Sequence, residues 1–122
     1  MANEKIVKTV HDLVGTELAA VSFVRDYVEF LFDGPVLRSL TSPRIVQGDT
    51  VSIFPEQGSR DALCSAIGSK VSAVELKEDD SFVLIFNHGD RIIIPLDKES
   101  GRKYEAMEFM PEPYGLIHQI WE

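Results

Sequence analysis

The chain carries one sequence pattern twice, and this internal repeat constrains the fold more than any other feature. Residues 13–23 align with residues 66–76 at a constant separation of 53 positions. After an adjustment of one residue, residues 28–33 match residues 82–87. Two copies are too few for an open solenoid, in which each terminal copy would leave an apolar face uncovered. The repeat therefore predicts two units that pack against each other about a pseudo-twofold axis.

Each copy is predicted to open with a short amphipathic helix. In the first copy, apolar side chains recur along one helical face between Ile6 and Val14. In the second copy, Ser59 is expected to cap the helix, because its hydroxyl can accept a hydrogen bond from an otherwise unpaired amide. Both helices are expected to end at a glycine, Gly15 or Gly68, the residue that best tolerates the left-handed turn after a helix.

Strands should follow each helix. Alternating apolar residues and short polar turns predict four strands per copy and one more at the end, over residues 18–24, 28–32, 36–40, 51–54, 71–76, 82–86, 91–96, 104–110 and 116–121. Residues 82–86 are apolar at every position, so this strand is expected to be covered on both faces.

These elements predict an α+β fold. We expect two tandem repeats, each a helix plus an antiparallel β-meander, packed with pseudo-twofold symmetry into one β-rich domain. The repeats cover approximately residues 5–57 and 58–113, and the C-terminal strand covers 116–121. A length of 122 residues suits a single domain and is sufficient for a core that needs no disulfide or metal.

Charge and cysteine content exclude several classes of protein. The net charge is −8, and the basic residues are scattered, which argues against nucleic acids and anionic membranes as partners. Cys64 is the only cysteine, so neither an intrachain disulfide nor a cysteine-based zinc site can form. No signal-peptide core and no apolar run of about 18 residues is present, and we expect a cytoplasmic protein.

The strongest polar cluster is the turn over residues 87–91, which contains His88 and Asp90. A histidine beside carboxylates could bind a divalent cation or act as an acid–base pair. Asn, Gly and Asp are also the residues that a tight turn requires, which is the simpler interpretation. The acidic run at residues 78–80 could likewise attract a basic partner or be a solvated turn.

Other polar candidates occupy equivalent places in the two copies. Glu56 and Glu112 each follow a proline and could form a carboxylate pair between the copies, or be separate exposed residues. A cleft between the copies could place Glu56, Glu112, His88 or His118. Cys64 and His11 also correspond, and packing explains both. The common catalytic signatures are absent, so we predict no catalytic residues, no metal and no cofactor.

The C-terminal stretch contains Tyr114 and Trp121, which are candidate interface residues. The last strand could complete a sheet and bury Trp121, or form an edge for a protein partner or a second copy of the chain. Together these features predict a non-catalytic cytosolic binding protein, one form of which is an acidic inhibitor or immunity-type protein. The alternative is a small-molecule-binding protein or hydrolase-like enzyme with a site between the two repeats.

Overall fold

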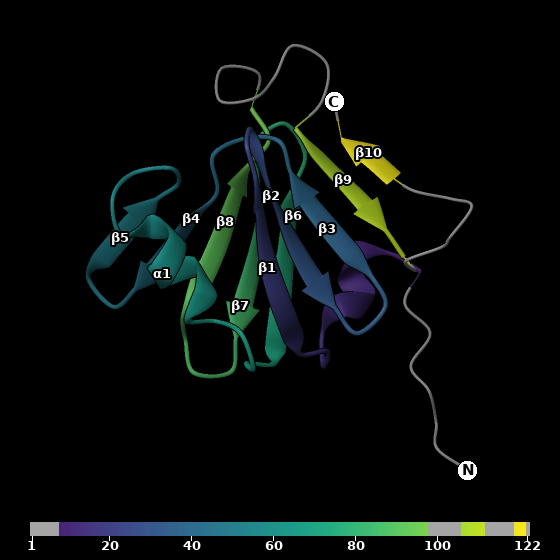
Figure 1. The fold of residues 1–122 in the computed structure, drawn as a ribbon. Helices are drawn as coiled ribbons and strands as arrows, with labels where there is room; N and C mark the ends of the chain where they lie inside the picture. Colours follow the sequence, from purple (N-terminus) through teal and green to yellow (C-terminus); the bar gives the residue numbers. More distant parts are fainter. Residues whose placement is uncertain (1–7, 98–105, 112–118, 122) are drawn as a thin grey trace.

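The computed structural model describes residues 8–97, 106–111 and 119–121, and it is built from two antiparallel five-stranded sheets (Figure 1). Sheet 1 has the order β1 (Leu18–Val24), β2 (Tyr27–Phe32), β3 (Val36–Ser39), β9 (Met107–Met110) and β10 (Gln119–Trp121). Sheet 2 has the order β5 (Thr50–Ile53), β4 (Arg44–Gln47), β8 (Arg91–Pro95), β7 (Ser81–Phe86) and β6 (Val71–Lys77). With the short helix α1 (Ser59–Cys64), the fold is β-rich and broadly of the α+β type.

Each sheet combines strands from both halves of the sequence. The hairpin β4–β5 belongs to the first half but pairs with β8, and β9 of the second half pairs with β3. The expectation that each half forms its own meander is therefore wrong for these strands. The strand β4 was not predicted at all, although its turn at Gly48-Asp49 is of the two-residue kind that closes tight hairpins. Gly48 adopts a positive φ of 62° there.

The hydrophobic core lies between the two sheets. Alternate residues of most strands point into it, and its largest fully buried side chains include Phe30, Phe82, Phe86 and Phe109. Burial of this apolar surface is the main favourable term in folding. The opposite faces point outward, so the expectation that residues 82–86 are covered on both sides is only partly met: Val83 is 8% exposed, but Ile85 is half-buried on the outer face.

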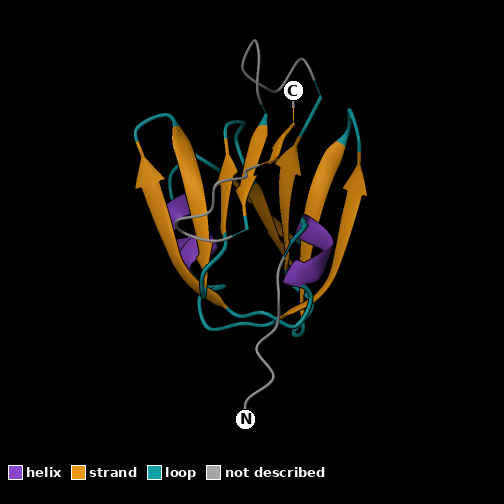
Figure 2. Cartoon of the chain, turned by 90° about the vertical axis from the view of Figure 1, so that its right-hand side faces the viewer, coloured by secondary structure: helices purple, strands orange, loops and turns teal. Residues whose placement is uncertain are grey.

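Two short helical segments cover the open sides of the sandwich, and they lie on opposite sides of the molecule (Figure 2). The 3-10 helix η1 (Val10–Leu13) contacts β6, whereas α1 contacts β1, β4 and β5. Leu13 and Leu63 are fully buried and fasten the two segments to the core. Neither segment is long and apolar enough to cross a membrane, and this holds for every helix within the described residues.

Both helix predictions need correction. The helix predicted up to Val14 is only the single turn Val10–Leu13, and residues 6–7 lie outside the described residues. In α1 the capping position is Gly58, with a φ of 85°, and Ser59 is the first helical residue. Its hydroxyl is buried and has no hydrogen-bond partner among the described residues, so it does not cap the helix.

Backbone hydrogen bonds join the two sheets where β1 and β6 begin. The amide of Gly15 donates to the carbonyl of Val71 at 2.7 Å, and the amide of Gly68 donates to Leu18 at 2.7 Å. An isolated antiparallel bridge connects Glu17 with Lys70 between them. Both glycines have the predicted positive φ, 90° and 91°, and Gly15 directly follows the cap of η1, but α1 ends at Cys64, four residues before Gly68. The junction brings Ser69 and the nearby hairpin turns to one end of the molecule.

Candidate functional site

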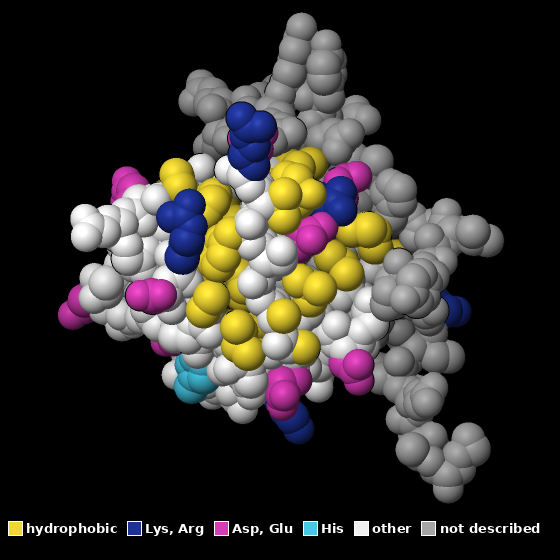
Figure 3. Space-filling model, viewed as in Figure 1, with side chains coloured by type: hydrophobic (Ala, Val, Ile, Leu, Met, Phe, Trp, Pro, Cys, Tyr) yellow, Lys and Arg dark blue, Asp and Glu magenta, His cyan; other side chains and the backbone are white. Residues whose placement is uncertain are grey.

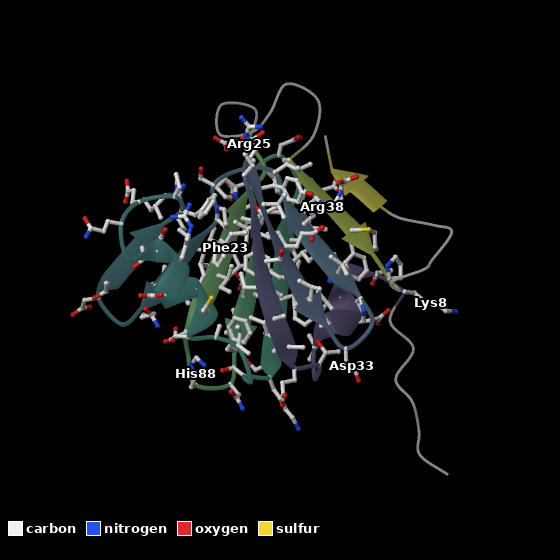
Figure 4. The ribbon with its side chains drawn as sticks, viewed as in Figure 1. Lys8, Phe23, Arg25, Asp33, Arg38 and His88 are labelled. Carbon is white, nitrogen blue, oxygen red and sulfur yellow. The ribbon has the colours of Figure 1, made fainter. Side chains whose placement is uncertain are left out.

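The turn between β7 and β8 is the first candidate site, and it contains more than the sequence indicated. His88 Nε2 lies 2.8 Å from the hydroxyl of Ser69, and His88 Nδ1 lies 3.6 Å from Oδ2 of Asp90. The structure therefore brings the predicted pair His88 and Asp90 together and adds Ser69, which the sequence analysis did not select. His88 lies at the opposite end of the molecule from Arg25 (Figure 4).

The position of the imidazole proton decides what this cluster can do. If Nδ1 carries the proton, it faces the Asp90 carboxylate and Nε2 can accept the proton of the Ser69 hydroxyl. If Nε2 carries it, Nδ1 accepts the backbone N–H of Asp90 at 3.4 Å and Nε2 donates to Ser69. The first tautomer has the order of groups used by serine nucleophiles, whereas the second only stabilises the turn.

The same residues also have structural partners. Gln47 Nε2 donates to Asp90 Oδ2 at 3.3 Å and to the hydroxyl of Ser65 at 2.9 Å, which ties β4 and the end of α1 to the turn. The His88 ring stacks on Phe86, with 6.0 Å between the ring centroids. These contacts account for a well-ordered hairpin turn, the simpler interpretation of residues 87–91.

Of the other predicted site residues, the structure describes only Glu56 with its side chain. Glu56 is exposed on the turn after β5, where its amide donates to the carbonyl of Ile53. Glu112, Tyr114 and His118 lie outside the described residues, as does the side chain of Trp121, although the backbone of Trp121 pairs with Met107. The predicted pairing of Glu56 with Glu112 therefore stays a prediction. In the part of the chain that the structure describes, no group of three or more His, Cys, Asp or Glu residues could hold a metal ion.

Cys64 and His11 lie on α1 and η1, on opposite sides of the molecule (Figure 2). Burial, and then the negative charge of Asp61, raises the pKa of the Cys64 thiol. A raised pKa keeps the thiol protonated near neutral pH and makes it a poor nucleophile. The packing interpretation of Cys64 therefore agrees with its environment.

The outer face of sheet 2 is the second candidate site. The strand register places six aliphatic residues on this face: Val46, Val51, Ile53, Val83, Ile85 and Ile93. Arg44 lies among them, between Ile53 on β5 and Ile93 on β8. Arg91 lies between Val46 on β4 and Ile85 on β7. Val51 is 52% exposed, and neither arginine has a carboxylate partner among the described residues.

The outer face of sheet 1 also carries hydrophobic side chains (Figure 3), but the arginine on its central strand, Arg38, is paired. Arg38 contacts Glu29 at 2.8 Å and Glu108 at 2.7 Å, one on each neighbouring strand. Its guanidinium also lies 5.0 Å from the centroid of the Tyr27 ring. Burial lowers the pKa of Arg38, but the hydrogen bonds and charges of the two glutamates outweigh this and raise it overall.

Comparison with protein-family models, curated proteins and solved structures gives no match to this chain. Two sites in the molecule could carry a function. One is the cluster of Ser69, His88 and Asp90 at the sheet junction, and the other is the outer face of sheet 2 with its two arginines.

Proposed function

We propose that the protein is a non-catalytic binding protein that contacts another protein through the outer face of sheet 2. The observation that carries this proposal is the aliphatic face itself, with Val51 largely exposed and with Arg44 and Arg91 lacking carboxylate partners in the described residues. Exposed apolar surface that contains arginine is typical of protein interfaces. On the outer face of sheet 1, by contrast, the charge of Arg38 is already neutralised by glutamates of the same chain.

The finer form of the proposal is an acidic, cytoplasmic inhibitor or immunity-type protein. A net charge of −8 would attract a basic partner over long distances and raise the rate of encounter. The turn between β6 and β7 adds three exposed carboxylates, Glu78, Asp79 and Asp80. In this view the overall charge steers the approach, and the outer face of sheet 2 forms the contact.

The proposal includes a duplicated architecture. Several backbone features recur 53 residues apart: the amide of Leu18 donates to Ser69 at 3.0 Å, and the amide of Val71 donates to Thr16 at 2.9 Å. Irregularities in strand register also recur, between Leu18 and Ala20 and between Val71 and Ala73. These correspondences support two related units that exchange their last strands. After duplication, one outer face could keep its ion pairs while the other became a contact surface.

The first prediction concerns Ile93, at the centre of this face. Ile93→Thr keeps a β-branched residue in β8 but places a hydroxyl in the contact surface, so it should reduce the amount of bound partner about tenfold. Native mass spectrometry of the protein recovered from its own cells measures this directly. A doubled mass would identify the partner as a second copy of the chain.

Val36→Thr is the matched control, since Val36 is a half-buried aliphatic residue on the outer face of sheet 1. It should leave the retained partner unchanged. Equal retention by the two variants would reject the outer face of sheet 2 as the contact surface.

A second function, a hydrolase-like activity, is favoured by the cluster at the sheet junction. With the proton on Nδ1, His88 could accept the Ser69 proton while Oγ forms a bond to an ester carbonyl. His88 would then pass this proton to the departing alcohol, and water would release the acid from Ser69. The tautomer with the proton on Nε2 opposes this chemistry, which is why this function ranks second.

The second prediction tests that activity. If the cluster is catalytic, the protein should hydrolyse p-nitrophenyl acetate, and Ser69→Ala and His88→Asn should each reduce the rate to that of buffer. Ser65→Ala, which changes another hydroxyl nearby, is the control and should keep the activity. Equal rates for Ser69→Ala and the unmodified protein would exclude the hydrolase function.

A further inference from the structure

We infer that Arg44 binds a carboxylate of the partner, so that the partner's contact surface is apolar and carries an aspartate, a glutamate or a chain-terminal carboxylate. This inference rests on the proposed function, because it assigns a chemistry to the same face. Arg44 would then determine specificity, because an apolar partner surface without a carboxylate would bind more weakly to this face.

Arg44 is held among aliphatic neighbours with part of its guanidinium unpaired. It is half-buried, and its cross-strand neighbours are Ile53 and Ile93. Its Nε atom is buried and has no hydrogen-bond partner among residues 8–97, 106–111 and 119–121. A buried N–H without an acceptor is unfavourable, and a guanidinium can bind a carboxylate through two parallel hydrogen bonds. Since the Nε atom is itself shielded from solvent, a carboxylate placed on this face would pair with the terminal amino groups of the half-buried guanidinium and supply the counter-ion that the described residues lack.

In the corresponding row of sheet 1, the arginine is neutralised by carboxylates of the same sheet. In sheet 1, Arg38 on the central strand lies between Glu29 and Glu108. In sheet 2, the central position is Ile93, with Val83 on one side and Arg44 on the other. The positive charge of Arg44 is thus present without the glutamates that accompany Arg38. The outer face of sheet 2 provides one half of an ion pair, and the partner provides the other half.

The charges disfavour a second copy of the chain as the occupant. In a face-to-face dimer with its twofold axis along β8, β4 of one copy would lie against β7 of the other, so Arg44 would face Val83, and Glu75, the carboxylate in the same row, would lie one strand further away on β6. An arginine buried against apolar groups without a counter-ion is strongly unfavourable. A polyphosphate chain is disfavoured by the net charge of −8 and by the aliphatic residues around Arg44.

The third prediction uses hexanoate as the probe, because it joins an aliphatic chain to one carboxylate. Titration of the ¹⁵N-labelled protein should move the amide signals of residues 44–46 and 91–93, with a dissociation constant on the order of a few millimolar. Hexanamide, the neutral analogue, should bind at least about tenfold more weakly, and Arg44→Gln should weaken hexanoate binding about tenfold. Lys77→Gln removes an equal charge from the β6 edge of the same face and should change the affinity less than about twofold.

Three results would overturn the inference. Equal binding of hexanoate and hexanamide would show an apolar surface without carboxylate recognition, and equal effects of Arg44→Gln and Lys77→Gln would show a general charge effect. Tighter binding of inorganic phosphate than of hexanoate at the same amides would assign Arg44 to phosphate. If any of these occurs while Ile93→Thr still loses the partner, only the role of Arg44 is wrong. If Ile93→Thr also keeps the partner, the proposed function fails with it.

Discussion

Phe109→Ala should lower the free energy of unfolding by about 3–5 kcal/mol, the usual cost of truncating a fully buried aromatic side chain. Phe109 has no exposed surface, and it pairs in register with Leu37 of β3, which is also fully buried. The substitution would leave a cavity at the place where the second half of the chain enters sheet 1. Urea unfolding followed by circular dichroism measures the change.

Met110→Ala is the control, because Met110 is the next residue on β9 and lies on the opposite, outer face. It is half-buried and should cost less than about 1 kcal/mol. A loss of stability as large as that of Phe109→Ala would mean that the two faces of β9 are assigned the wrong way round. A loss below about 1 kcal/mol for Phe109→Ala would contradict its place in the core.

The strands that form local hairpins could be predicted from the sequence. The predicted strand over residues 18–24 is the observed β1, and the prediction over residues 82–86 differs from β7 by one residue. In both cases alternation of apolar and polar residues, or a continuous apolar run, lies between short turns, so the signal is local. The turn after β2 contains Gly34 with a φ of 109°, the positive φ for which glycine is favoured in such short turns.

The strand β4 could not be predicted in the same way. It contains four residues, and only Ile45 is buried, which is too little for an alternating pattern to appear. Its partner β8 is distant in the sequence, so the pairing depends on contacts that no local pattern encodes. The exchange of last strands between the two halves was missed for the same reason.

The candidate site was predictable only where its residues are neighbours in sequence. His88 and Asp90 share one turn, so their spacing alone suggested contact. Ser69 reaches His88 only because the segment after α1 packs beside the β7–β8 turn. Arg44 was not selected, since its lack of a partner depends on which residues of β5 and β8 lie beside it. Local sequence patterns indicate turns and the faces of strands, whereas ion pairs between strands can be identified only when the register of strand pairing is known.

Arg38→Met should lower the free energy of unfolding by about 2 kcal/mol at pH 7, because it leaves Glu29 and Glu108 without their shared cation. Breaking a fully buried ion pair costs about 3–5 kcal/mol. These side chains keep 27%, 19% and 13% of their surface exposed, so solvent screening reduces the cost. Removal of one glutamate charge in the same background, as in Arg38→Met with Glu29→Gln, should recover part of the loss.

The dependence of this effect on pH follows from the raised pKa of Arg38. A group whose pKa is raised by folding stabilises the protein below its unfolded pKa, which for arginine lies far above neutral pH, and loses that stabilisation as the pH rises through the folded value. The stabilisation from Arg38 should therefore be constant between about pH 6 and pH 9. Urea unfolding of both proteins across this range tests it, with the exposed Lys77→Met as the control, expected to change stability by less than about 0.5 kcal/mol. If Arg38→Met costs no more than Lys77→Met, the ion pairs of sheet 1 contribute nothing to folding, and the contrast between Arg38 and Arg44 loses its energetic basis.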